Sequence, residues 1–275
     1  MHILITNDDG IGSAGLAVLA RAALQRGHTV QVAAPAHEYS GASASLAGEE
    51  RDGKIVLVEA DPPGMPQDVE CVGVRAAPGL ITFLACYGAF GDKPDLVMSG
   101  CNLGANTGHA TLHSGTVGAA HTAVTHDVLG LAVSVTSADP QHWDTVERVT
   151  DIALEWIEQA GFNGHVLNIN VPDVEWSRLR GLKGAHLAPF GAVQARIDDR
   201  FTEGLAVTYV AEAGDDEPGS DHHLLTQGWA TATWLRAPVD NMHLPLPEFV
   251  GAADGSDVQE YQPDSARVMT TREAQ

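Results

Sequence analysis

Short apolar runs alternate with segments of helical periodicity along the first two-thirds of the chain. The run His2–Thr6 is rich in β-forming residues and predicts a buried strand, and residues 29–34 predict another, which ends at Pro35. Apolar residues between them, from Leu16 to Leu24, recur at helical spacing, and Gly27 supplies a stop signal. This strand–helix–strand order predicts a βαβ unit, and therefore a parallel sheet with a right-handed crossover.

The same alternation continues beyond this first unit. Further strands are expected at residues 54–59, 96–99, 131–135 and 166–171, and further helices at 80–87, 117–125 and 146–159. Residues 229–235 read WATATWL, an alternation that predicts a half-exposed strand. The fold class predicted is α/β, with a Rossmann-like parallel sheet core flanked by helices.

The pattern changes after about residue 186, which suggests a division of the chain. Residues 1–186 form the expected catalytic core, and two β-like runs within residues 187–220 predict a projecting β-hairpin arm. Residues 221–250 are expected to hold a returning strand and a C-terminal segment. Residues 251–275 contain few apolar residues and are expected to be a flexible tail.

Composition and charge restrict the classes of function. The chain has 275 residues, 44% of them hydrophobic, which is enough for one sizeable α/β domain with an appendage. A formal net charge of −21 would repel polyphosphate backbones, so binding to bulk nucleic acid is not expected. A small phosphate ester is still possible as a ligand, because a bound metal ion can reverse the local sign of the charge.

Other sequence features bear on compartment and redox state. No run approaches the ~20 apolar residues that would span a bilayer, and the start MHILITNDDG does not resemble a signal peptide, so a cytoplasmic location without membrane attachment is expected. The three cysteines, Cys71, Cys86 and Cys101, are odd in number and widely spaced. Buried free thiols are therefore expected rather than a disulfide framework.

The loop after the first predicted strand carries two adjacent carboxylates, Asp8 and Asp9. Ligands of open parallel sheets bind beyond the carboxyl ends of the strands, so this loop is a candidate site. Hard divalent cations favour carboxylate oxygens on such a rigid loop. The alternative makes Asp9 a helix N-cap and Asp8 a solvated turn residue, and the residues alone leave both interpretations open.

Residues 10–15 read GIGSAG and match the dinucleotide-binding pattern G-x-G-x-x-G. Two features argue against a dinucleotide site. Asp8 and Asp9 immediately precede the glycines and would repel a pyrophosphate, and the second strand ends without an acid that could bind a ribose. A dinucleotide-dependent oxidoreductase is therefore a weak rival hypothesis.

Three later loops also carry polar residues at expected strand ends. Asn102 and Asn106 are separated by a glycine, and their amides can coordinate a cation or donate to a phosphate, although Asn-Gly turn chemistry explains them too. Ser114 opens a predicted helix whose N-terminal amides form a ready anion site, and an N-cap role for Ser114 is the compatible alternative. Ser40 and Gly41 allow close backbone approach to an ion, or form a simple polar linker.

The combination of these motifs, in order and spacing, resembles the SurE family of metal-dependent nucleotidases. The motifs are NDDG at 7–10, SGAS at 40–43, SGCNLGAN at 99–106 and SGTV at 114–117, with later similarity at 166–172 and 220–231. The resemblance covers most of residues 1–235. The chain departs from the family pattern at His121, where relatives commonly carry an acidic residue a few positions after SGTV.

The resemblance implies roles for particular residues. The ligands of one divalent ion per subunit, Mg²⁺ or Mn²⁺, would be Asp8, Asp9, Ser40 and Asn102. The substrate phosphate would be bound by Gly41, Asn106, Ser114, Gly115 and Thr116, and the catalytic set would be Asp8, Asp9, Asn106 and Ser114. His109 lies beside these residues in the chain and is a candidate substrate contact and general acid.

The implied activity is hydrolysis of nucleoside 5′- or 3′-monophosphates to nucleoside and phosphate, a phosphomonoesterase reaction like that of acid phosphatases. The family also implies a homodimer or homotetramer. Attack by water is favoured over attack by an aspartate, because the adjacent acids differ from the DxD arrangement of aspartyl-phosphate phosphatases. The alternative is a non-catalytic nucleotide or sugar-phosphate binding protein with the same pocket. A zinc site formed by His109, His113, His121 and His126 is also considered, but their spacing matches no closed tetrahedral pattern.

Overall fold

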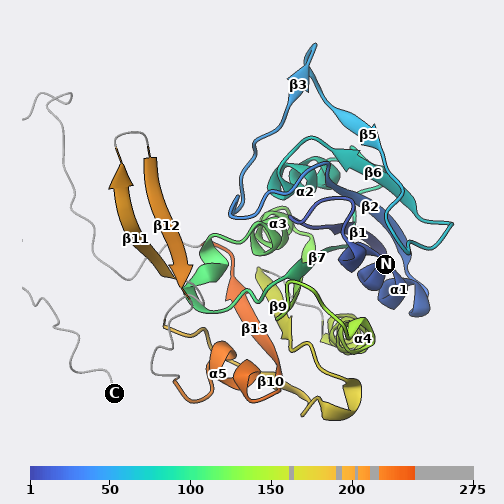
Figure 1. The fold of residues 1–275 in the computed structure, drawn as a ribbon. Helices are drawn as coiled ribbons and strands as arrows, with labels where there is room; N and C mark the ends of the chain where they lie inside the picture. Colours follow the sequence, from blue (N-terminus) through green and yellow to red (C-terminus); the bar gives the residue numbers. More distant parts are fainter. Residues whose placement is uncertain (161–163, 190–193, 202–203, 211–216, 239–275) are drawn as a thin grey trace, which may run out of the picture. The chain divides into compact units, whose positions relative to one another are not determined.

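A nine-stranded sheet forms the centre of the computed structural model, which describes residues 1–160, 164–189, 194–201, 204–210 and 217–238. Its strand order is β10-β13-β9-β8-β7-β1-β2-β6-β5 (Figure 1). Neighbouring strands are parallel except in the pairs β13–β9 and β5–β6, which are antiparallel. The predicted α/β class with a mainly parallel sheet is confirmed.

Five strands in the middle of the sheet are largely buried on both faces, as expected of mainly apolar strands in a doubly covered parallel sheet. They are β1 (His2–Thr6), β2 (Thr29–Pro35), β7 (Leu96–Leu103), β8 (Leu129–Val135) and β9 (His165–Val171). Each of the first three is followed by a loop that carries predicted site residues, so these loops meet at the carboxyl edge of the sheet.

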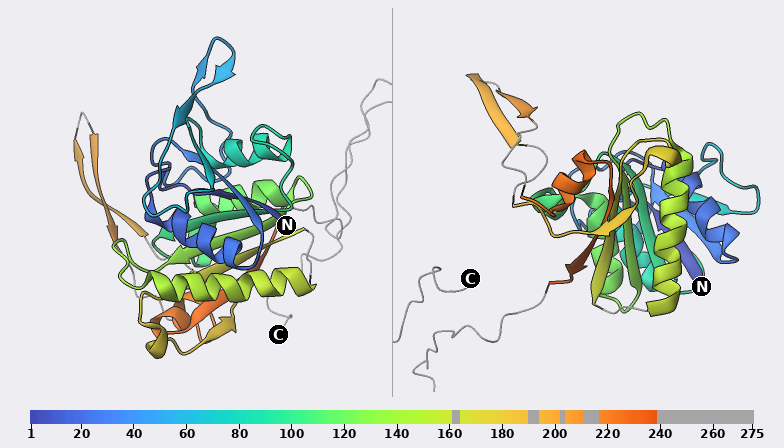
Figure 2. Two further views of the ribbon diagram at one scale, coloured as in Figure 1. Left: turned by 90° about the vertical axis from the view of Figure 1, so that its right-hand side faces the viewer. Right: turned by 90° about the horizontal axis from the view of Figure 1, so that it is seen from below.

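Helices cover both faces of this sheet. Helices α1 (Ala14–Gln25) and α4 (Trp143–Ala160) contact each other on one face, and Figure 2 shows them side by side in blue and yellow-green. Helices α2 (Pro78–Cys86) and α3 (Gly115–Val124) contact each other and belong to the other layer. Side chains of β1 alternate between the layers, since Ile3 and Ile5 join the core beneath α1 and α4 whereas Leu4 joins the core beneath α2. Each such buried aliphatic side chain stabilises the fold by about 1.5–3 kcal/mol relative to an exposed one.

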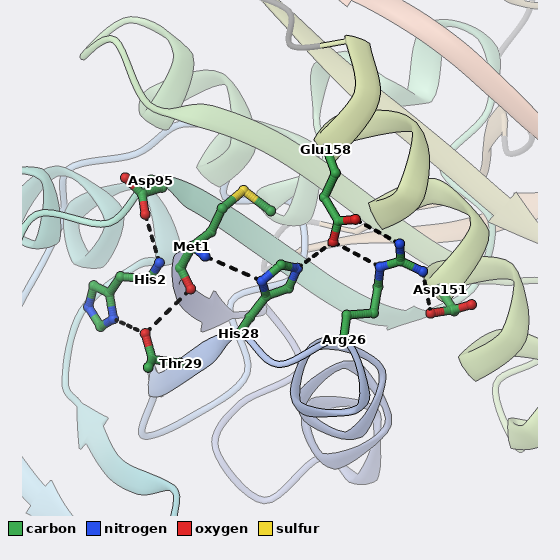
Figure 3. Close-up of polar contacts among 8 residues, drawn as sticks. All are labelled: Met1, His2, Arg26, His28, Thr29, Asp95, Asp151 and Glu158. Atoms are coloured by element: carbon green, nitrogen blue, oxygen red, sulfur yellow. Dashed lines mark hydrogen bonds and ion pairs between the residues drawn. The ribbon is translucent and has the colours of Figure 1, made fainter.

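Ion pairs fasten α1 to α4 at the amino ends of the strands (Figure 3). The guanidinium of Arg26 donates from Nη1 to Asp151 Oδ1 at 2.9 Å, and from Nη2 to Glu158 Oε2 at 2.7 Å. His28 Nε2 lies 2.8 Å from Glu158 Oε1, and its Nδ1 lies 3.3 Å from the amino group of Met1. The first residue and the two helices are thereby held at the edge opposite the candidate site.

The predicted central elements are confirmed, and several peripheral ones were missed. The run at 54–59 is interrupted at Val56 and divides into β4 (Lys54–Ile55) and β5 (Leu57–Glu59). The missed elements are short or lack a clear apolar pattern, and they are β3 (Glu50–Arg51), β6 (Glu70–Val74), β10 (Leu182–Gly184), α5 (Asp221–Thr226) and the 3₁₀ turns η1 (Gly108–Leu112) and η2 (Trp176–Arg178).

The expectation of a half-exposed strand at 229–235 is wrong for most of its length. Strand β13 (Ala230–Arg236) is buried from residue 230 to residue 233, and Trp234 is its first exposed residue. The reason is that other elements pack against the strand: Ala230 and Ala232 join the main hydrophobic core, and helix α5 contacts β13. Alternation in the sequence therefore reflects small and hydroxyl side chains that fit an interior position, and not exposure.

A β-hairpin is present where the two β-like runs predict one. Strands β11 (Gln194–Phe201) and β12 (Gly204–Val210) pair antiparallel and form a two-stranded sheet of their own. The domain division at residues 186, 220 and 250 stays a prediction, and the tail at 251–275 lies outside the described residues. None of the described helices combines the length and apolar character needed to span a membrane. The three cysteines are free thiols, two buried and Cys71 half-buried.

Candidate active site

Backbone hydrogen bonds bring the loops after β1, β2 and β7 together with the start of α3. The N–H of Tyr39 donates to the carbonyl of Asp8 at 2.7 Å, which joins the first two loops. The N–H of Leu103 donates to Asp9 Oδ2 at 3.4 Å, and the N–H of Thr116 donates to Asp8 Oδ2 at 3.0 Å. The four predicted segments therefore surround the acidic pair.

Asp8 is buried, with 3% of its surface exposed, and its carboxylate is held by α3. Both oxygens accept hydrogen bonds from Thr116, one from the backbone N–H and the other from the side-chain hydroxyl. Burial raises the pKa of Asp8 above its usual value, and the two bonds from Thr116 offset part of that rise. At Gly115 a Cβ atom would lie 2.8 Å from Asp8 Oδ2, so only glycine permits this close approach of carboxylate and helix N-terminus.

Asp9 is half-buried beside this first carboxylate. Burial, then the negative charge of Asp8 and more weakly that of Glu38, raise the pKa of Asp9 to about 7, although the N–H of Leu103 opposes the shift. The alternative in which Asp9 caps the helix and Asp8 is solvated is wrong. Ser13 is the N-cap of α1, where its side chain accepts from Gly15 N–H, and Asp8 is buried.

Ser40 has an unpredicted acidic neighbour. Its hydroxyl donates to Glu38 Oε1 at 2.7 Å, and both residues line a cleft of about 600 Å³ together with Asp9. The next residue, Gly41, has a φ of +79°, a left-handed turn that glycine adopts without strain. Nothing in the sequence around Glu38 distinguishes it from an ordinary loop acid, which is why it was missed.

The side-chain amide of Asn102 has a fixed orientation. Its Nδ2 donates to the carbonyl of Gly104 at 2.6 Å, and among the described residues no hydrogen bond engages its Oδ1. The predicted ligands thus offer two carboxylates, one hydroxyl and one amide oxygen. This all-oxygen donor set fits a hard cation such as Mg²⁺ or Mn²⁺ better than zinc. In the part of the chain that is described, no cluster of three or more His, Cys, Asp or Glu side chains supports the considered zinc site.

Asn106 is almost completely buried and is held by three polar side chains from the sheet. Its Nδ2 donates to Ser134 Oγ at 2.9 Å, and its N–H donates to Asn170 Oδ1 at 2.7 Å. Its carbonyl accepts from Asn168 Nδ2 and Asn170 Nδ2 at 2.9 and 3.0 Å. Sequence reasoning missed these supports, although two asparagines within the apolar strand VLNINV are a signal, since buried amides require partners.

Ser114 caps helix α3, as one of its two predicted roles requires. Its Oγ accepts from Val117 N–H at 3.1 Å. The loop containing Ser40 packs against the same region, because Ser43 Oγ donates to the carbonyl of Leu112 at 2.8 Å. A Cβ at Gly118 would collide with the backbone of Ser43, so this contact also depends on glycine.

Two residues of the predicted substrate site, Thr116 and His109, lie in different environments: one is buried and the other is exposed. Thr116 is fully buried and directs both donors to Asp8, so its contact with a phosphate stays a prediction. His109 is exposed on η1, and its role also stays a prediction. The turn η1 is anchored by Asp221, whose Oδ2 accepts from Gly108 N–H at 2.9 Å and which sequence reasoning did not single out.

Comparison with known proteins decides the family. The family model described as survival protein SurE matches residues 3–192 of this chain. The chain belongs to the SurE family. The match includes all the predicted metal and phosphate residues, from Asp8 to Thr116.

Similarity to individual SurE proteins extends over most of the chain. The 5′-nucleotidase SurE of Alkalilimnicola ehrlichii is 31% identical, with 85% of this chain and 88% of that protein covered. The 5′-nucleotidase SurE of Laribacter hongkongensis is 35% identical, with coverage of 86% and 92%. The crystal structure of the SurE protein from Aquifex aeolicus superposes with a TM-score of 0.73 at 25% identity and covers 88% of this chain and 95% of that one.

Proposed function

We propose that this SurE protein is a metal-dependent phosphomonoesterase that hydrolyses nucleoside 5′- or 3′-monophosphates to nucleoside and phosphate. The printed activity of its relatives, 5′-nucleotidase, supports the substrate class. The observation that carries the chemistry is the pair Asp8 and Asp9, a buried and a half-buried carboxylate with raised pKa values beside the N-terminus of α3. Such a pair is stabilised by a cation, and a cation at a helix N-terminus is suited to binding a phosphate.

We propose one divalent ion per chain, Mg²⁺ or Mn²⁺, with Asp8, Asp9, Ser40 and Asn102 as ligands. The all-oxygen donor set and the Asn102 amide, whose nitrogen is already engaged, support this assignment. When bound, the ion supplies positive charge that neutralises the phosphoryl group.

The residues of the chain provide orientation and proton transfer. Thr116 fixes Asp8 through both of its donors, and this engagement of both oxygens makes Asp8 a poor nucleophile. We therefore propose attack by water, which forms the new P–O bond as the ester P–O bond breaks. We propose that Asp9 takes the proton of that water, which its position in the lining of the cleft supports.

Binding of the phosphate and departure of the nucleoside need hydrogen-bond donors on the other side. We propose that Ser114, Gly115 and Asn106 bind the phosphoryl oxygens and that His109 protonates the leaving oxygen. The first turn of α3 contributes the positive end of its dipole to this region. We also propose that Gly41 contacts the substrate and that Thr116 acts on the substrate indirectly, by orienting Asp8.

We further propose a cytoplasmic homodimer or homotetramer. Large apolar side chains are exposed on the described surface, among them Leu112 at 71% and Leu46 at 56% exposure, and they support a contact between copies. Size-exclusion chromatography with light scattering tests this directly, since a monomeric mass would contradict it.

The activity is tested by phosphate release from a panel of nucleoside 5′- and 3′-monophosphates, with Mn²⁺, with Mg²⁺ and with a chelator. We expect release only when a divalent ion is present. Binding of nucleotide without any release under all conditions would instead support the non-catalytic alternative. Protection by NAD(P) without any metal effect would support the dinucleotide hypothesis.

A further inference from the structure

The described lining of the cleft of about 600 Å³ beside Asp9 does not include Asn106, Ser114 or Gly115, the residues proposed to bind the phosphate. One wall is formed by the loops after β1 and β2, and the opposite wall by residues 138–140 and Trp143 at the start of α4. Its volume is typical of small-molecule sites. The metal and phosphate roles proposed above use Asp9 and Ser40 but leave the opposite wall without a function.

That opposite wall is held in place by Asp173. Its carboxylate accepts from the backbone N–H groups of Gln141 at 3.1 Å and His142 at 2.9 Å. Its own N–H donates to Thr136 Oγ1 at 3.0 Å, so both ends of the loop between β8 and α4 are fixed. The cleft is therefore a preformed feature, with Trp143 positioned directly after the last of these bonds.

Trp143 is the one aromatic residue in the part of the cleft lining that the structure describes. It is half-buried and packs against the main hydrophobic core, which restrains the ring while part of it borders the cleft. Gly12 and Ala14 add little bulk on the α1 side. A flat ring beside open space suits a planar partner, because stacking of a nucleobase on an aromatic side chain contributes ~1–3 kcal/mol.

The charge of the cleft restricts what else it accepts. Among the described residues, its lining contains the carboxylates of Asp9, Glu38 and Asp139 and no lysine, arginine or histidine. Carboxylates accept hydrogen bonds from hydroxyl groups such as those of a ribose. They repel additional phosphate groups, so a nucleoside with a single phosphate on the metal side is the best complement.

We propose that this cleft is the nucleoside subsite, with the base against Trp143 and the ribose hydroxyls at Asp139. The assignment rests on the proposed function, since it takes the reacting phosphate to lie at the metal and the helix α3 N-terminus. It makes Trp143 a determinant of specificity for nucleotides over small phosphate esters. It also makes Asp139 a determinant of selectivity for monophosphates over diphosphates.

Kinetics of Trp143→Leu test the assignment. The KM for a nucleoside monophosphate should rise about tenfold, which corresponds to about 1.4 kcal/mol, whereas inhibition by inorganic phosphate should be unchanged. The matched control is Trp156→Leu, which alters an exposed tryptophan on the same helix and should leave both values unchanged. If Trp143→Leu is too unstable, Trp143→Phe should show a two- to fourfold rise confined to the nucleotide.

Equal changes in nucleotide KM and phosphate inhibition, or no change in either, would overturn the assignment of Trp143. A second variant, Asp139→Asn, tests the role of Asp139. It should raise kcat/KM for a nucleoside diphosphate, relative to kcat/KM for the monophosphate, at least threefold. An unchanged ratio would overturn the role of Asp139.

A binding measurement separates this inference from the proposed function. Saturation-transfer NMR with adenosine, without phosphate or metal, should show contact with the wild-type protein and with Trp156→Leu, and a much weaker signal with Trp143→Leu. An enzyme that releases no phosphate from any ester would overturn the proposed function and leave this test intact. Active enzyme whose adenosine signal survives Trp143→Leu would overturn the subsite alone.

Discussion

Two groups of carboxylates lie at opposite ends of the parallel strands and have opposite electrostatic surroundings. At the amino ends, Glu158 is paired with Arg26 and His28 (Figure 3), and the hydrogen bond from Arg26 lowers the pKa of Glu158 to about 2. At the carboxyl ends, no ion pair joins Asp8 or Asp9 to a cationic side chain of the described residues. Burial there raises the pKa values of both, that of Asp9 to about 7.

The difference separates a structural cluster from a functional one. Asp151 and Glu158 on α4 are paired with Arg26, so they stabilise the packing of α1 and α4 without any ligand. The acidic pair after β1 has hydrogen-bond donors but no counter-charge from any side chain that the structure describes. We infer that this end of the sheet is complete only when a divalent cation is bound, and the following predictions test that contrast.

The largest effect is expected from Asp9→Asn, which removes a proposed ligand and the proton acceptor. Turnover of a nucleoside monophosphate should fall by at least about a hundredfold, since loss of metal-based charge stabilisation costs several kcal/mol. Without metal, the variant should melt no lower than the wild type, because a buried charge is neutralised. The matched control, Glu158→Gln, should keep turnover and lower the melting temperature. Loss of turnover in Glu158→Gln together with normal turnover in Asp9→Asn would contradict the contrast between the two ends of the strands.

The second prediction concerns pH. A carboxyl with a raised folded-state pKa contributes stability that is fully present below its unfolded value near 3.8 and is lost as pH rises through about 7. The metal-free protein should therefore lose stability across this range. Proton competition at Asp9 should make Mn²⁺ binding roughly 30-fold weaker at pH 5.5 than at pH 8. Thermal melting with and without Mn²⁺ at both pH values measures this, and an equal metal-induced shift at both would count against it.

The Glu158 end should behave differently over the same range. Its lowered pKa gives stability that is present above the unfolded value near 4.5 and is lost only as pH falls towards 2. The destabilisation caused by Glu158→Gln should therefore be similar at pH 5.5 and pH 8.

A third, smaller effect is expected from Thr116→Val, which removes the hydroxyl that donates to Asp8 while preserving the shape of the side chain. A hydrogen bond to a charged group contributes about 1.5–3 kcal/mol, so Mn²⁺ affinity should fall about tenfold or more. Titration calorimetry measures the affinity. Thr116→Ser, which keeps the hydroxyl, should retain most of it, and equal losses in both variants would argue against orientation by this bond.

The smallest effect is expected from Arg26→Ala, which removes both ion pairs to α4. Exposed and half-exposed pairs contribute ~0.2–1 kcal/mol each, so the free energy of unfolding should fall by about 1 kcal/mol. Chemical denaturation checks this value, with kcat/KM as the control. A loss of turnover in Arg26→Ala would show that the two ends are coupled rather than independent.

Local patterns in the sequence predict the central fold well, because both layers of helices bury apolar strands. The runs that became β1, β2, β7, β8 and β9 are mainly apolar, and this is the property that a doubly covered parallel strand requires. Strand β13 was misjudged because its burial depends on packing against the main core and against α5, which no local pattern reveals.

The candidate site was predictable to the level of its loops and not to the level of its contacts. The carboxyl-edge rule and the motifs place Asp8, Asp9 and Asn102 together. The supports of Asn106 come from residues 28, 62 and 64 positions away, and the anchor of Gly108 comes from Asp221, 113 positions away. Such long-range contacts, including the hydrogen bonds from Thr116 to Asp8, depend on the packing of the whole sheet.

The most direct test of the central claim is calorimetric titration of the metal-free protein with Mn²⁺ at pH 8. We predict one saturable site per chain in the wild type and in Glu158→Gln, and loss of that site in Asp9→Asn. Unchanged Mn²⁺ binding in Asp9→Asn, or the absence of a saturable site in the wild type, would contradict the claim that a divalent ion completes the acidic pair.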